Sequence, residues 1–311
     1  MTILLGLSGA LAYGFADFLG GLASRSIRPI VATAWAALIG LVPLAVGLAV
    51  LGGRFSADAL LWGTVAGIAG SLGVLMLYTA LAVGPMSVLS PVTSVVSVIV
   101  PVGVGLLFAG SRLTGLGIAA VVVAVVAVGL VGAVKDRSGA RLTGRGLLTA
   151  VAAGCGFGGL VLAYAATTPE DGLAPLVVAR VVQAVVMWIG VAVVAGVAGR
   201  ERGRRGAATA ATSAAAATSR TAAAWSPGRR GGLWLQLAIC GTLDASANVL
   251  IQAALHSGAS ADVLPLVSVL NALYPIGTVI LAAIVLRERL TLIQIIGLAL
   301  ALAASAVLAS T

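Results

Sequence analysis

The chain has 311 residues, of which 60% are hydrophobic and 9% are charged, and its mean hydropathy is +1.16. A soluble domain of this length needs far more polar surface, so a soluble globular protein is excluded. The formal net charge of +9 is typical of nucleic-acid binders, but the Arg residues lie between uncharged apolar stretches, as juxtamembrane charges do. We therefore expect a membrane protein that binds no nucleic acid.

Apolar stretches of about 20 residues, long enough to span a bilayer as helices, recur along the whole chain. The first has no basic region before it, so we expect a membrane helix and not a cleaved signal peptide. In chain order the ten predicted spans are 3–22, 30–51, 59–82, 86–108, 115–134, 146–166, 173–197, 233–255, 260–285 and 291–309.

One long connection, 198–231, consists mainly of Ala, Thr, Ser and Arg. This composition cannot bury a core, so we expect disorder, with its charge attracted to anionic lipid headgroups. Most basic residues fall on the face that carries this loop, which predicts that both termini lie outside and the loop lies in the cytoplasm. The preference for Arg over Lys fits a GC-rich bacterial genome, and hence the bacterial cytoplasmic membrane.

Small residues inside the spans predict close helix packing. Gly63-x-x-x-Gly67 and Gly154-x-x-x-Gly158 have the required spacing. Residues 154–159 also match GxGxxG, but they follow no strand, so helix packing explains them better than a dinucleotide site. Both cysteines fall inside spans, and we expect each to be a small buried core residue; no disulfide, metal site or cofactor is predicted. These cysteines are Cys155 and Cys240.

The chain contains an internal duplication. Residues 80–103 and 254–277 align at an offset of 174, with 8 of 24 positions identical. An odd number of spans in each copy inverts the second copy in the membrane, which is the architecture of many secondary transporters. Each conserved proline frees a backbone carbonyl, and it either breaks the helix near a central site or only shapes packing. The shared prolines are Pro91, Pro101, Pro265 and Pro275.

We therefore predict an all-α polytopic membrane protein with ten transmembrane helices in two inverted five-helix repeats. Residues 1–134 form the first repeat, 135–145 a basic linker and 146–311 the second repeat, which contains the Arg-rich loop.

The run from Tyr78 to Pro91, Tyr-Thr-Ala-Leu-Ala-Val-Gly-Pro-Met-Ser-Val-Leu-Ser-Pro, resembles the EamA repeat of the drug/metabolite transporter superfamily. The second repeat, with Arg-Glu-Arg-Leu at 287–290, resembles it more closely, since the first has Ser111 where the second has Glu288. The resemblance implies ten helices and transport of amino acids, metabolites or drugs, commonly as an exporter. It also implies cytoplasmic termini, opposite to the charge count.

Ionisable residues inside spans are costly and are functional candidates. In the eighth span, polar residues recur every four positions, which places them on one helix face that must line a cavity or meet polar partners. His256 lies near a helix end, which favours a solvated interfacial role. This polar face consists of Asp244, Asn248, Gln252 and His256.

Helical rise places Asp17 and Asp244 at similar depth, with Arg180 nearer the face that bears the termini. We hypothesise that Arg180 pairs with one acid and the other carries a coupling proton, while Arg180 with Gln183 orients an anionic group. The alternative is an ion pair that only fixes helix packing. The predicted substrate contacts are Tyr13, Asp17, Arg180, Gln183, Asp244, Asn248, Gln252, Ser268 and Asn271.

The predicted function is a secondary transporter, an exporter of a small metabolite, amino acid or drug-like solute by alternating access. Its partners are that solute, a coupling proton and membrane lipids; the oligomeric state stays open. A membrane scaffold or receptor subunit would explain the helices but not the paired prolines. An intramembrane protease would use two acids at one depth, but neither aspartate lies in such a signature.

Overall fold

The computed structural model describes residues 2–108, isolated positions between 115 and 126, and residues 143–210, 227–256, 274–287 and 291–310. Every regular element within these residues is helical. The elements are α1 (Thr2–Ser24), α2 (Pro29–Leu51), α3 (Ala57–Val83), α4 (Met86–Phe108), α6 (Gly144–Ala165), the 3₁₀ turn η1 (Pro169–Asp171), α7 (Ala174–Ala210), α8 (Pro227–His256), α10 (Pro275–Val285) and α11 (Leu292–Ser310).

The predicted spans in the described parts of the chain coincide with helices to within a few residues at most ends. Among the described residues, six helical segments are long and apolar enough to cross a membrane, and they lie in α1, α2, α3, α6, α7 and α8. Of the predicted span 260–285, the structure describes only the part that contains α10, and most of 115–134 lies outside the described residues. The protein is therefore an all-helical, multi-pass membrane protein.

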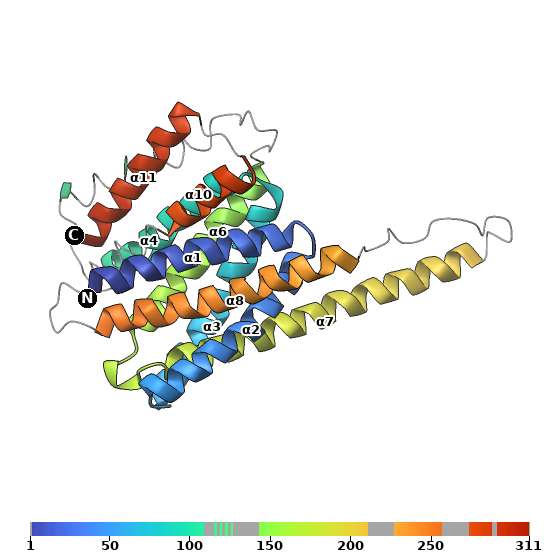
Figure 1. Ribbon diagram of the computed structural model, residues 1–311, viewed down its shortest axis with the longest axis horizontal. Helices are drawn as coiled ribbons and strands as arrows, with labels where there is room; N and C mark the ends of the chain where they lie inside the picture. Colours follow the sequence, from blue (N-terminus) through green and yellow to red (C-terminus); the bar gives the residue numbers. More distant parts are fainter. Residues whose placement is uncertain are drawn as a thin grey trace.

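Helix extends into both ends of the segment predicted to be disordered. α7 continues to Ala210 and projects past the rest of the bundle, and α8 begins at Pro227 (Figure 1). Ala and Arg are among the strongest helix formers, so a segment that cannot form a core can still continue a helix that the bundle has nucleated. Residues 211–226 of this loop, and 135–142 of the predicted linker, lie outside the described residues.

The helices of the two halves pack against each other in corresponding pairs. α3 packs on α6 and α7, while α8 packs on α1 and α2. α4 contacts α6, and α10 contacts α1 (Figure 1). α2 also packs against α7, and α4 against α10. Most of the packing within the described bundle therefore joins one half of the chain to the other.

Glycines allow the closest of these crossings. A Cβ added at Gly63 or Gly67 of α3 would lie within 3.0 Å of α7 atoms, which confirms the predicted packing role of this pair. A Cβ at Gly241 of α8 would lie 2.6 Å from the carbonyl oxygen of Ala36 on α2. Gly67 and Gly241 are separated by 174 positions, the offset of the duplication.

The glycines of the GxGxxG match also pack helices, as predicted. A Cβ at Gly154 would meet Val96 of α4 at 2.5 Å, and one at Gly156 would meet Gly73 of α3 at the same distance. Cys155, between them, is exposed, so the expectation that it is a buried core residue is wrong. Because Gly154 packs against α4 and Gly156 packs against α3, the Cys155 side chain between them points away from both helices. Cys240 is buried as predicted.

Replacement of Gly14 by Ala is expected to destabilise the bundle. The new methyl group would clash with the Tyr274 carbonyl oxygen and lie 2.9 Å from Gly277 Cα, and backbone atoms cannot retreat as a flexible side chain can. We expect a loss of about 1–3 kcal/mol, seen as a lower thermal unfolding midpoint in detergent. Gly196→Ala is the matched control, because that position on α7 is exposed and a Cβ added there would have no described atom within 4 Å beyond its own stretch of helix. This substitution should be neutral or slightly stabilising.

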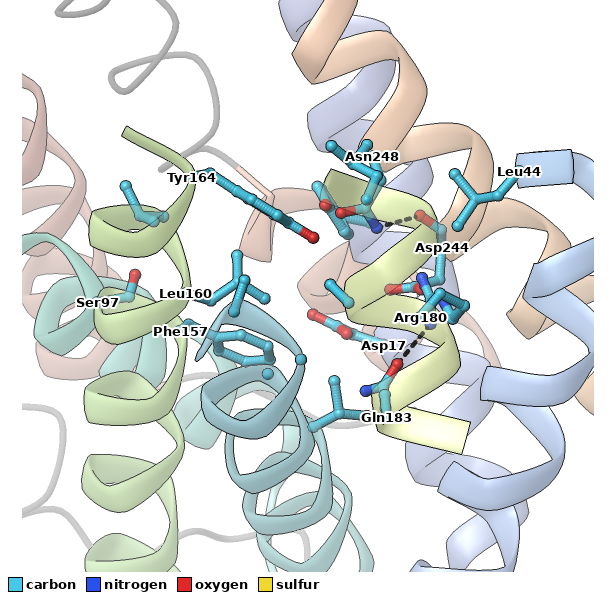
Figure 2. A pocket seen from close by; sticks show the side chains of 18 of the residues that line it. Asp17, Leu44, Ser97, Phe157, Leu160, Tyr164, Arg180, Gln183, Asp244 and Asn248 are labelled. Atoms are coloured by element: carbon cyan, nitrogen blue, oxygen red, sulfur yellow. Dashed lines mark hydrogen bonds and ion pairs between the residues drawn. The ribbon is translucent and has the colours of Figure 1, made fainter. Parts of the chain in front are cut away.

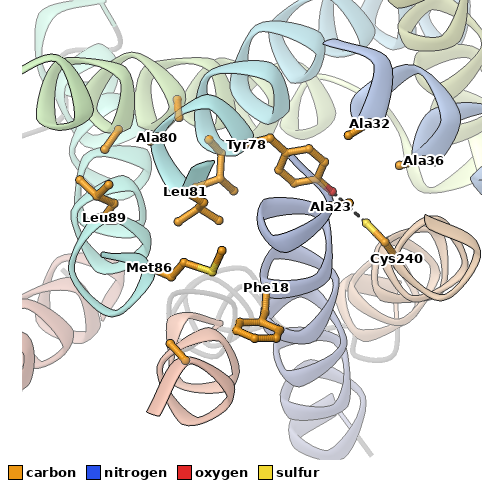
Figure 3. Close-up of a cluster of buried hydrophobic side chains, with 14 of the residues drawn as sticks. Phe18, Ala23, Ala32, Ala36, Tyr78, Ala80, Leu81, Met86, Leu89 and Cys240 are labelled. Atoms are coloured by element: carbon orange, nitrogen blue, oxygen red, sulfur yellow. Dashed lines mark hydrogen bonds between the residues drawn. The ribbon is translucent and has the colours of Figure 1, made fainter. Parts of the chain in front are cut away.

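One end of the bundle is sealed by apolar packing. The sealing cluster comes from the end of α1, the start of α2, the end of α3, the starts of α4 and α6, the first half of α8 and the end of α10, and Figure 3 shows part of it. It therefore lies toward the end of the bundle where Arg25 follows α1 and Arg145 lies at the start of α6. Arg25 donates hydrogen bonds to the carbonyl oxygens of Leu81 and Gly84 at 3.3 and 3.1 Å, which ties the α1–α2 turn to the α3–α4 turn. The largest side chains of this cluster include Phe18, Leu77, Tyr78, Leu81, Met86, Leu89 and Leu237.

The opposite end is joined by a polar contact between the two halves. Ser56 caps α3 by accepting a hydrogen bond from the backbone of Ala59, and its hydroxyl donates to Asp171 of η1 at 2.6 Å. The backbone N–H and hydroxyl of Thr168 both donate to the other Asp171 oxygen at 2.9 Å. This contact holds the α2–α3 connection against the α6–α7 connection.

These hydrogen bonds make the stability of that contact depend on pH. Donation by Ser56, followed by the Thr168 backbone, lowers the pKa of Asp171. Its stabilisation is therefore present above the unfolded-state pKa and is lost as pH falls through the lower folded-state pKa. We expect the unfolding midpoint to fall less on acidification in Asp171→Asn than in the wild type. Glu170→Gln is the control, because its ion pair with Arg54 is exposed and adds little.

Candidate functional site

A cavity lies between the two halves, away from the sealed end. It contains about 780 Å³ of empty space, including the part open to the exterior. Its walls come from α1, α2, α3, α4, α6, α7 and α8, together with Tyr274 just before α10 (Figure 2). The predicted site residues that line it are Tyr13, Asp17, Arg180, Gln183, Asp244 and Asn248.

Arg180 and Asp244 form an ion pair between α7 and α8 (Figure 2). Arg180 Nη2 donates to the Asp244 carboxylate, and Nη1 donates to Gln183 Oε1 at 2.9 Å. Gln183 is three residues along α7, on the same helix face. The two charged side chains are only 9% and 14% exposed, so loss of either partner would leave an uncompensated charge inside the membrane.

Asn248 continues the polar face of α8 beyond Asp244. Its Nδ2 donates to the backbone oxygen of Asp244 at 2.8 Å, one helical turn earlier. Gln252, the next residue of this face, is buried, but it is not among the residues that line the cavity. The predicted polar face is therefore divided: Asp244 and Asn248 line the cavity, and Gln252 does not.

Asp17 is the second acid at the cavity. It projects from α1 and is 7% exposed. Within the described parts of the chain, no hydrogen bond or ion pair reaches its carboxyl group. Arg180 thus pairs with Asp244, and of the two predicted acids it is Asp17 that remains without a cation among the described residues.

Several aromatic side chains line the cavity that were not among the substrate contacts predicted from the sequence. Phe157 and Tyr164 of α6 and Tyr274 face the cavity together with Tyr13. The chain has only 4 tyrosines, and three of them are in this lining. The small number of Tyr residues was therefore the one feature of the sequence that could have marked them as candidates. The buried Tyr274 hydroxyl has no hydrogen-bond partner among the described residues.

The duplicated prolines occupy different settings. Pro91 and Pro101 both lie inside α4, whereas Pro275 is the first residue of α10, where its missing N–H costs no helical hydrogen bond. The other predicted site residues in this region, Ser268 and Asn271, lie outside the described residues, as does Pro265. Ser97, which aligns with Asn271 at the offset of 174, does line the cavity.

Metal binding finds no support in the described parts of the chain. No group of three His, Cys, Asp or Glu side chains lies close enough there to hold an ion. The polar groups of the cavity are one carboxyl–guanidinium pair, one further carboxyl group, amides and hydroxyls, a set suited to binding an organic solute and a proton.

Comparison with known proteins finds a family similarity within the second half of the chain. No curated protein matches the chain. One solved crystal structure aligns with 98% of this chain and 95% of its own, with a TM-score of 0.52 and 16% identity, which shows a similar fold and no more. Residues 177–310 match the EamA-like transporter family. Residues 177–310 of this multi-pass membrane protein are therefore similar to the EamA-like transporter family, in agreement with the resemblance found in the second predicted repeat.

Proposed function

We propose that the protein is a secondary transporter that exports a small metabolite, amino acid or drug-like solute across the bacterial cytoplasmic membrane by alternating access, coupled to a proton at Asp17. The observation that carries the proposal is the cavity between the two halves, with a buried acid that has no cation partner in the described structure. The export direction follows the family resemblance.

Corresponding contacts support two inverted repeats around this cavity. If α1, α2 and α3 are equivalent to α6, α7 and α8, the pair α3–α6 corresponds to α8–α1, and the pair α3–α7 corresponds to α8–α2. At the offset of 174, Gly70 corresponds to Asp244 and Val74 corresponds to Asn248, and all four residues line the cavity. Two antiparallel copies can exchange conformations to open either face.

The unequal ends of the bundle support alternating access. The residues that line the cavity lie between the centres of the helices and the end of the bundle that carries Asp171. Tyr164, the penultimate residue of α6, is the part of the lining near that end. The other end is filled by the sealing cluster. A transporter caught with one side closed has this arrangement, and exchange of the two repeat conformations would move the seal to the opposite end.

Asp17 is the better candidate for the coupling proton. A buried carboxylate without a cation is costly in a membrane, so a proton or a bound solute must compensate it. The other titratable groups around the cavity are Tyr13, Tyr164, Tyr274, Arg180 and Asp244. Tyrosine and arginine ordinarily keep their protons near neutral pH, and Asp244 is compensated by Arg180.

Solute release from cells tests the proposal. Extracellular metabolites are compared between cells that express the wild type and cells that express Asp17→Asn, and each solute enriched by the wild type is then tested in proteoliposomes. We expect flux of at least one such solute to rise with an imposed pH gradient. If no enriched solute crosses the proteoliposome membrane, the protein is not a carrier, and a scaffold or receptor subunit becomes the better explanation.

A further inference from the structure

The cavity carries an excess of negative charge. Among the described residues, its lining has two carboxyl groups, Asp17 and Asp244, against the single guanidinium of Arg180. Arg180 is also the only Lys or Arg within the ten predicted spans, so the sequence offers no second cation at this depth. After the Arg180–Asp244 pair is counted as neutral, the charge that faces a solute is that of Asp17.

Part of the wall of the cavity that Asp17 lines is aromatic. Tyr13 lies four residues from Asp17 on the same face of α1, and Phe157 and Tyr164 lie on α6. Figure 2 shows Tyr164 and Asp17 projecting into the cavity from different helices. The faces of aromatic rings attract cations electrostatically, most strongly where water is excluded. A carboxylate among such rings recognises an ammonium group attached to an apolar body.

Arg180 is poorly placed to bind a free anion. Both of its terminal nitrogens already donate to protein oxygens, those of Asp244 and Gln183. An anionic solute would meet a guanidinium whose charge Asp244 already balances, and it would also meet the charge of Asp17. The Tyr274 hydroxyl, without a partner among the described residues, offers a donor to a hydroxyl or carbonyl group of the solute.

We infer that the cavity binds an organic monocation, an amine with an apolar or aromatic body, whose ammonium group pairs with Asp17 among the rings of Tyr13, Phe157 and Tyr164. This inference rests on the proposed transport function for its biological meaning, but binding can be measured without transport. It also implies that solute and proton occupy the same carboxyl group in turn.

Four probes with one phenyl ring and different head groups test the inference: phenethylamine, phenethyl alcohol, hydrocinnamate and phenylalanine. Binding to the full chain in lipid nanodiscs is measured by calorimetry near neutral pH, where the amine is a cation. We expect phenethylamine to bind at least about tenfold more tightly than the alcohol. In Asp17→Asn this preference should disappear while the alcohol binds as before.

A second pair of variants tests the rings without touching the acid. Tyr164→Phe keeps the aromatic face and should retain the preference for the amine, whereas Tyr164→Leu should reduce it several-fold. Equal binding of amine and alcohol to the wild type would overturn the inference, as would tighter binding of hydrocinnamate or phenylalanine, which would place a carboxylate on Arg180. Amine binding without flux in proteoliposomes would contradict the transport proposal alone, and flux of hydrocinnamate would contradict the monocation alone.

Discussion

Asp17→Asn is expected to reduce pH-gradient-driven solute flux in proteoliposomes to the level of protein-free liposomes. The amide has nearly the shape of the carboxyl group, but it can neither carry a proton nor balance a cation. The amide can form hydrogen bonds in the same polar cavity, so we expect the free energy of unfolding to change by no more than about 1 kcal/mol. The thermal unfolding midpoint in detergent measures this change. Loss of flux without loss of folding would separate a transport role from a structural one.

Asp58→Asn is the matched control for this variant. It makes the same chemical change at an exposed position in the first turn of α3, outside the cavity. Flux and its pH dependence should equal those of the wild type. If Asp17→Asn retained pH-dependent flux, Asp17 would not be the proton carrier, and Asp244 would become the candidate despite its pairing with Arg180.

The helices were predictable because bilayer-spanning length and apolar composition are local properties of the sequence. The contact of Gly63 and Gly67 with α7 was predictable as a packing motif, although the partner helix was not. Cys155 shows the limit of such reasoning: its span is uniformly apolar, so neither hydropathy nor periodicity distinguishes its lipid-facing side from its packed side. Only the contacts of the neighbouring glycines decide which way it points.

Six of the nine predicted substrate contacts line the cavity, but the pairing among them was not predictable from the sequence. Helical rise places Asp17 and Asp244 at one depth, so depth alone could not decide which acid Arg180 meets. The choice depends on how α1 and α8 rotate about their axes, which is fixed by packing between helices far apart in the sequence. Tyr164 and Tyr274 lie near helix ends and belong to no periodic pattern of polar residues, so the sequence did not indicate them as site residues.

The Arg180–Asp244 pair gives the second large expected effect. Arg180→Met would leave Asp244 without its cation, and Asp244→Leu would leave Arg180 without its anion, each in a nearly closed site between α7 and α8. Removal of one partner of a buried pair commonly costs about 3–5 kcal/mol, so we expect both single variants to unfold at markedly lower temperature in detergent. The double variant, Arg180→Met with Asp244→Leu, removes both charges and should regain most of the lost stability.

Transport by the double variant then decides what the pair contributes. The double substitution leaves the net charge of the cavity lining unchanged, and Asp17 remains, so we expect pH-dependent flux to persist in proteoliposomes. Solute affinity should change where Gln183 loses Arg180 as its hydrogen-bond partner. A stable double variant whose flux no longer responds to pH would assign the coupling proton to Asp244. A double variant as unstable as the singles would instead show that these side chains stabilise the α7–α8 contact by their packing and not by their charge.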